Sequence, residues 1–197
     1  MQRAYRSLFL FFIFYVLANG FDSKWVAVGS LHNWYSSVGC ELEVGRTGQV
    51  SEQLDGRRFP AQDDFQDSQA SKALWIGSSN YADPLAGITY PYKVVSIGPR
   101  GPVDPVAVLP VEFTSYSRFA TPQVFVDGQN ASLDVHIDNT PDFIDPDLPA
   151  DNMLVNTIHT SIGVSMTRKI YAFSHPQHDN YMITDYVFKN TGIITGS

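Results

Sequence analysis

The chain has 197 residues, a formal net charge of −7 and 13% aromatic residues. The negative charge argues against nucleic acid or an anionic membrane surface as a partner, and the aromatic content excludes a disordered chain. Cys40 is the only cysteine, so no internal disulfide can form and stability has to come from packing or from a bound ion.

Residues 1–20 have the pattern of a helical, cleavable signal peptide. Arg3 and Arg6 precede the apolar run LFLFFIFYVLA, and Ala18-Asn19-Gly20 matches the small-x-small cleavage pattern. That run is shorter than the roughly 20 residues of a membrane-spanning helix. We therefore expect a protein that is secreted, periplasmic or on the cell surface, without a membrane partner once the signal is removed. Because two arginines and no acid are lost, the charge of residues 21–197 becomes −9.

The first part after the signal predicts one strand, then an aromatic and polar run, and then a long polar excursion. KWVAV (24–28) is followed by the aromatic and polar run LHNWYSSVG (31–39). Residues 41–73 are rich in Gln, Ser, Asp and Arg, which is typical of a loop, and we expect one helical turn around Asp67–Lys72.

Strand-like runs then recur with turn residues between them, and no long stretch keeps a helical period. The candidate strands are residues 73–77, 88–97, 106–119, 123–126, 133–137, 153–160, 163–173 and 181–189. Pro91 predicts an edge position or a bulge, because proline has no ladder donor. Asp127-Gly128 is a strong hairpin signal. Together these runs predict a single all-β domain over residues 21–197, an antiparallel β-sandwich with long loops.

The last of these runs, residues 181–189 (YMITDYVFK), has apolar residues on both of its alternating faces. That pattern predicts an internal strand, with His178-Asp179-Asn180 and Asn190-Thr191-Gly192 as its turns. Asp185 should then lie near the rim of the sheet or be hydrogen-bonded. Since another strand should follow an internal one, we interpret the chain as incomplete at its C-terminus.

The proline-rich loop 139–152 contains the best candidate for a metal site. Four aspartates lie within ten residues there: Asp142, Asp145, Asp147 and Asp151. Calcium is bound by carboxylates and carbonyls, so this loop carries a calcium hypothesis, although its spacing is not that of an EF-hand. The alternative is a solvated loop in which the aspartates cap turns. No other cofactor is predicted.

Other chemical signals are weaker. His175 and His178 are spaced as zinc ligands, but no further Cys or His cluster completes a site, which favours a polar hairpin connection. No G-x-S-x-G elbow or HExxH helix is present, so no catalytic residue is assigned. Exposed aromatics are a possible glycan platform, either Trp34 and Tyr35 or the three tyrosines Tyr81, Tyr90 and Tyr92.

Several stretches together resemble a known group of proteins. They are NWYSSVGCELEVG, QASKALWIGSSNYAD, GITYPYKVVSIGPR, TPQVFVDG and HDNYMITDYVFKNTG. Residues 31–192 resemble the N-terminal region of large secreted or cell-surface proteins of Bacteroidetes-like and marine bacteria, which often carry type IX secretion sorting domains. The resemblance implies further domains of the same or a neighbouring surface protein as partners, and it supplies no site residues.

The sequence is compatible with two functions. The first is an exported, non-enzymatic module for structure, adhesion or assembly. The second is a carbohydrate-binding module or the leading domain of a secreted glycoside hydrolase. Aromatics gathered beside two convergent acids in one cleft would favour the second function, and buried aromatics with scattered acids would favour the first.

Overall fold

The computed structural model describes residues 21–42, 56–63, 67–69, 71–98, 101–120, 125–130 and 140–195. These residues form strands joined by turns and one short 3-10 helix, so the predicted all-β class is confirmed. The predicted signal peptide and the candidate strand 133–137 lie outside the described residues.

The first sheet contains the N-terminal strands. Its members are β1 (Ser23–Val28), β2 (Leu31–Ser36), β3 (Glu41–Leu42), β4 (Arg57–Arg58) and β5 (Asp67–Gln69). β1 and β2 are antiparallel, with Trp25 opposite Trp34. The tight turn between them passes through Gly29, which has a φ of 77°. β5 replaces the start of the helical turn predicted around Asp67–Lys72, because Asp67 pairs with Arg58 and Gln69 with Arg57 instead of bonding locally.

The second large sheet contains the C-terminal strands, in the order β12-β9-β13-β14-β15. Their bounds are β12 (Phe143–Ile144), β9 (Val108–Ser117), β13 (Asn152–Thr160), β14 (Val164–Ala172) and β15 (Met182–Asn190). The predicted antiparallel succession of the last three strands is confirmed. Pro110 lies within β9, close to a register shift between Thr157 and Ile158 of β13. β12 is parallel to β9 and lies inside the stretch predicted as a loop.

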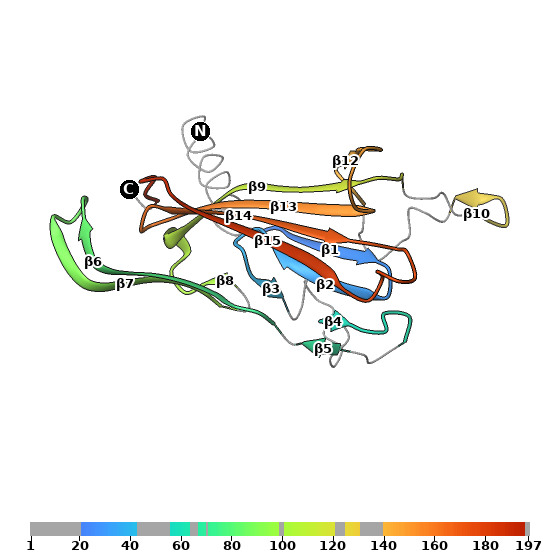
Figure 1. Cartoon of the computed structure of the whole chain (residues 1–197), viewed down its shortest axis with the longest axis horizontal. Helices are drawn as coiled ribbons and strands as arrows, with labels where there is room; N and C mark the ends of the chain where they lie inside the picture. The colour runs from blue at the N-terminus through green and yellow to red at the C-terminus, as the bar shows by residue number, and fades with distance from the viewer. Residues whose placement is uncertain are drawn as a thin grey trace, which may run out of the picture.

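A long antiparallel hairpin, which we call the arm, is built by β6 (Leu74–Asp83) and β7 (Ile88–Gly98). β8 (Gly101–Pro102) pairs with the end of β7, and the 3-10 helix η1 (Pro105–Ala107) leads into β9. In Figure 1 the arm runs along the molecule and its tip projects beyond the two large sheets. Asn80 has a φ of 50° and lies opposite Pro91, where the ladder is interrupted as the proline predicted.

A second, short hairpin is formed by β10 (Phe125–Val126) and β11 (Gln129–Asn130). Asp127 and Gly128 both have positive φ, as a two-residue turn of the predicted Asp-Gly type requires. The hairpin lies at the end of the molecule opposite the tip of the arm (Figure 1).

The core lies between the two large sheets. One cluster joins Val26 and Tyr35 of the first sheet to Leu154, Ile170 and Ala172 of the second. A second cluster, at the base of the arm, contains Val38, Cys40, Val95, Ile97, Ala107, Val108, Ile158, Ile162 and Met166. Burial of one such aliphatic side chain contributes about 2 kcal/mol, so these contacts hold the layers together.

β15 is an edge strand, so the prediction of an internal strand for residues 181–189 is wrong. Among the described strands it pairs with β14 alone, and Ile183, Val187 and Phe188 are 49%, 43% and 49% exposed. Apolar residues on both faces therefore do not distinguish a covered strand from an uncovered edge. Asp185 is exposed at the rim of the sheet, as predicted.

Candidate binding surfaces

The first of the four predicted metal ligands, Asp142, connects two strands. Its carboxylate accepts hydrogen bonds from Lys24 Nζ at 2.9 and 3.0 Å and from the Ser115 amide at 2.6 Å. Asp145 accepts the Asp147 amide at 3.0 Å, which is the turn-capping alternative considered for this loop.

Asp151 stabilises the start of the connection between β14 and β15. Its Oδ2 accepts the Ser174 amide at 2.7 Å and the Ser174 hydroxyl at 2.8 Å, and Arg118 Nη1 lies 3.5 Å from Oδ1. Burial acts to raise the pKa of Asp151, but the bonds from Ser174 and the charges of Arg118 and His175 together hold that pKa below its usual value. The Asp151 carboxylate is therefore already engaged by Ser174 and Arg118 of the same chain.

No group of three or more His, Cys, Asp or Glu side chains in the described ranges has the arrangement of a metal site. Asp142, Asp145, Asp147 and Asp151 are all within those ranges. Calcium binding by this loop therefore stays a hypothesis with no assembled ligand set behind it.

His175 and His178 belong to a small ring cluster in the connection between β14 and β15. Their rings are 5.7 Å apart, and His178 Nδ1 is 2.5 Å from the Tyr181 hydroxyl. Phe173 packs 6.3 Å from His178 and 6.1 Å from Tyr181. These contacts order the predicted polar connection.

Of the aromatic residues predicted as a glycan platform, Trp34 and Tyr35 are buried, with exposures of 3% and 2%. Both lie on β2, where that strand packs into the core, so this part of the prediction is wrong. The neighbouring Asn33 is also buried and donates to Glu41.

The arm presents the main exposed aromatic surface of the described structure. Trp75 is 73% exposed, Tyr92 is 79% exposed and Val94 is 56% exposed. They lie on one face of the hairpin, because Trp75 pairs with Ser96 and Gly77 with Val94 in the same ladder. We call these three residues the arm face. Tyr92 was among the candidates from the sequence, and Trp75 could have been found because it alternates with Leu74 and Ile76.

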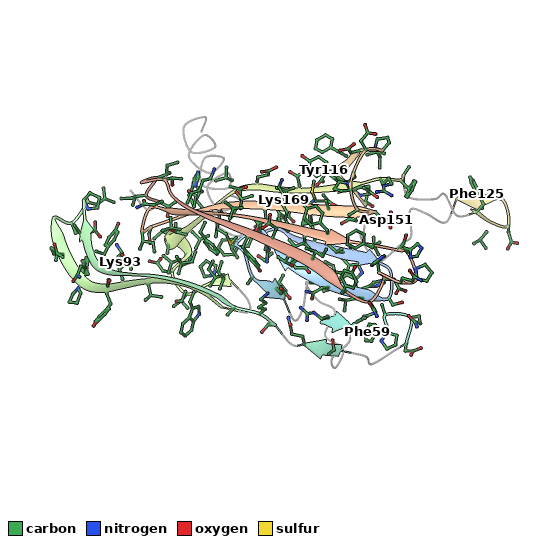
Figure 2. The ribbon with its side chains drawn as sticks, in the orientation of Figure 1. Phe59, Lys93, Tyr116, Phe125, Asp151 and Lys169 are labelled. Atoms are coloured by element: carbon green, nitrogen blue, oxygen red, sulfur yellow. The ribbon has the colours of Figure 1, made fainter. Side chains whose placement is uncertain are left out.

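The opposite side of the arm tip is closed by its own contacts. Lys93 Nζ is 2.7 Å from Asp83 Oδ2 and lies over the rings of Tyr81 and Tyr90, at 4.7 and 5.6 Å from their centroids (Figure 2). The hydrogen bond from Lys93 is the main cause of a lowered pKa at Asp83. Tyr81 donates to the Ser161 carbonyl at 3.1 Å and ties the arm to the second large sheet. Tyr81 and Tyr90 are therefore engaged in holding the arm.

A cavity of about 220 Å³ lies at the base of the arm, beside β15. It is lined by Gly39, Glu41, Lys72, Ala73, Leu74, Tyr186 and Phe188. Tyr186 and Phe188 stack with their planes 6° apart, and Lys72 Nζ lies 5.5 Å from the centroid of the Tyr186 ring. The cavity therefore has an aromatic wall supplied by the edge strand.

Glu41, at the inner wall of this cavity, is the centre of a buried polar cluster. Its Oε2 accepts Asn33 Nδ2 and Arg57 Nη2 at 2.8 Å and Gln69 Nε2 at 3.0 Å, and Lys72 Nζ is 3.3 Å from Oε1. Burial acts to raise the pKa of Glu41, but these donors and cations lower it further than burial raises it. The cluster joins β2, β3, β4 and β5, and sequence reasoning missed it because those residues appeared to be a loop.

Comparison of the chain with protein-family models, with curated proteins and with solved structures finds no match. None of the helical segments in the described ranges has the length and apolar character needed to cross a membrane. Function therefore has to be argued from the arm face, the cavity and the edge of β15.

Proposed function

We propose that the chain is an exported, non-enzymatic β-sandwich module of a bacterial surface or extracellular protein, serving structure, adhesion or assembly. Its partners on this proposal are other domains of the same or a neighbouring surface protein. The arm face carries the proposal. A two-stranded hairpin is marginally stable by itself, and a projecting one with Trp75, Tyr92 and Val94 in solvent gains stability when a partner covers it.

The disposition of the acids supports the same function. Asp83, Asp142 and Asp151 each bond to a separate basic or amide group, and Glu41 is enclosed by four donors. Each of these carboxylates is thus engaged by donors of its own chain, whereas the paired acids of a glycoside hydrolase have to face a substrate.

The second candidate function, glycan binding, is favoured by one observation. Trp75 and Tyr92 are rings with large exposed faces on a single hairpin surface, and such rings stack on sugars. Their partners in the ladder are Ser96 and Ser79, two short hydroxyls on a projecting face. Ligand sites are ordinarily concave, so this is the weaker proposal.

An envelope-binding assay tests the proposed function. The purified chain is incubated with cell-envelope material of the bacterium that encodes it, before and after periodate oxidation of the glycans. We expect binding that survives oxidation and that Trp75→Ser with Tyr92→Ser abolishes. Phe125→Ser is the matched control, because Phe125 is 60% exposed on the hairpin at the other end of the molecule (Figure 2).

Two outcomes would count against assembly. If oxidation abolishes binding and the chain also binds glycans on an array, the arm face is a carbohydrate-binding surface and not an assembly surface. If the arm variant and the Phe125→Ser control bind equally well, the arm face contributes to neither assembly nor glycan binding.

A further inference from the structure

In the described chain the edge of β15 has little of the usual protection of an exposed strand: two charged side chains, Asp185 and Lys189, and no proline or bulge. It is nine residues long, contains no proline, and keeps an uninterrupted register with β14 from Met182 to Asn190. Exposed edges of this kind are ordinarily shortened, bulged or broken by proline, because their free backbone groups can pair with another chain. Its exposed apolar residues Ile183, Val187 and Phe188 increase that tendency.

The charges on β15 are arranged symmetrically about one residue. Asp185 and Lys189 lie on the same face of the strand, two positions before and two positions after Val187. Across the existing ladder Asp185 is opposite Lys169, and Lys189 is opposite Ser165. An antiparallel copy of the strand centred on Val187 would therefore present Lys189 to Asp185 and Asp185 to Lys189.

We propose that β15 is a self-recognition edge, through which two copies of this chain pair antiparallel about a two-fold axis at Val187. The pairing places Val187 opposite Val187 and forms two Asp185–Lys189 pairs on the same face. It also extends the sheet across both copies. Opposite charges at directly opposed positions of antiparallel strands stabilise the pair, and like charges there destabilise it.

The other face of β15 supports the same register. Tyr186 of each copy would lie opposite Phe188 of the other, so that the two stacked ring pairs described above meet across the axis. Aromatic cross-strand pairs are among the favourable neighbours in a sheet. Phe188, 49% exposed in the isolated chain, would be covered beside the cavity that Tyr186 and Phe188 line.

The register is specific, because a shifted one loses these matches. Pairing about Tyr186 would place Asp185 opposite Val187 and Lys189 opposite Ile183, which leaves both charges against apolar side chains. β15 shares no residue with the arm face, so this inference goes beyond the proposed function and is tested by different variants.

A charge exchange tests the proposal. Sedimentation equilibrium of the purified chain should show a monomer–dimer equilibrium. Asp185→Lys or Lys189→Asp should each weaken dimerisation about tenfold, because each places like charges opposite one another. The double exchange Asp185→Lys with Lys189→Asp should restore the dimer. Asp147→Lys, the same charge change on an exposed loop, is the control and should have no effect.

A cysteine cross-link tests the register itself. Val187→Cys should form a disulfide-linked dimer on mild oxidation, since the two residues 187 are directly opposed and within bonding reach. Lys189→Cys should not, because the two residues 189 would be about 13 Å apart along the strands. Cys40 is 1% exposed and will not compete.

A wild-type chain that stays monomeric at all concentrations would overturn the proposal, as would a double exchange that fails to restore the dimer. Equal cross-linking at positions 187 and 189 would also overturn it. Since Lys189→Asp faces only Ser165 in its own chain, it remains informative if Asp185→Lys beside Lys169 does not fold. Dimerisation that persists in the Trp75→Ser, Tyr92→Ser variant would separate this edge from the arm face.

Discussion

Arg168 Nη2 donates to Asn156 Oδ1 at 3.1 Å, and both side chains are completely buried between the sheets. The same guanidinium donates to the carbonyls of Ser36 at 3.1 Å and Gly39 at 3.0 Å, and its Cζ lies 5.2 Å from the Tyr35 ring centroid. None of the ion pairs formed by described residues includes Arg168. Its function is therefore to bind the turn between β2 and β3.

Replacement of Arg168 should destabilise the fold strongly. Arg168→Met should lower the free energy of unfolding by about 3 kcal/mol, because buried carbonyls lose their donors. Arg168→Lys should recover only part of that loss, since one ammonium cannot match the planar fork. Urea unfolding followed by circular dichroism measures both. Lys169→Met, on the opposite face, is the control and should stay within about 0.5 kcal/mol of wild type.

Gly29 should tolerate no side chain. A Cβ there would lie 2.5 Å from the Phe173 carbonyl oxygen and 2.7 Å from the Asp179 carbonyl oxygen, which accepts the Ser30 and Leu31 amides. We expect Gly29→Ala to cost about 3 kcal/mol or more, from strain and the displaced backbone. Gly87→Ala is the matched control: its φ is also positive at 65°, but nothing lies within 4 Å, so only about 1 kcal/mol is expected. Equal losses in thermal melts would contradict the steric argument.

The Glu41 cluster predicts a loss of stability in acid. Because the pKa of Glu41 is lowered in the folded state, its contribution is complete above the ordinary glutamate pKa of about 4.3 and is lost as pH falls through the folded value. Asp151 changes in the same direction. Unfolding by urea at a series of pH values should show Glu41→Gln less stable than wild type at pH 7, with the difference shrinking in acid. A constant difference would mean that charge at Glu41 does not matter.

Calcium should leave the melting temperature unchanged. Asp142 and Asp151 are already held by Lys24, Ser115, Ser174 and Arg118, so the loop gains little by binding a cation. The measurement is thermal melting in millimolar calcium and in a chelator. A ligand that binds only the native state must stabilise it, so a higher melting temperature in calcium would restore the metal hypothesis.

Trp75 should account for the quenchable tryptophan fluorescence of the described chain. Trp25 and Trp34 are each 3% exposed, whereas Trp75 is 73% exposed. Iodide should therefore quench only a fraction of the emission, and Trp75→Phe should remove that fraction. If quenching persists in Trp75→Phe, the arm face is covered or the core is open to solvent.

Strands and turns that have a local sequence pattern could be predicted, and contacts between distant segments of the chain could not. Strand-like runs in close succession identified β13, β14 and β15, and Asp127-Gly128 identified its hairpin. Nothing local to Arg168 shows that its carbonyl partners lie more than 120 residues earlier in the chain. A charged residue in an alternating strand is ordinarily expected on the wet face, which is why Arg168 was not recognised as part of the core.

The candidate site was predicted less well for related reasons. Trp34 and Tyr35 lie in a polar run that resembles a loop, yet β2 is a central strand whose partners come from several sides. β12 consists of only Phe143 and Ile144 between prolines, so no periodicity marks it. For β15, apolar residues on both faces are equally compatible with a covered strand and with an edge.

The two borders of the second large sheet are not equivalent. On the β9 side, Pro110 has no amide hydrogen to offer, and β12 already pairs with Tyr116 and Ser117. On the β15 side the ladder is continuous and open in the described chain. Only one border of this sheet can therefore pair with another copy. Edge-to-edge association then ends at a dimer and cannot continue into a fibre, so an exposed edge strand can be tolerated at high concentration.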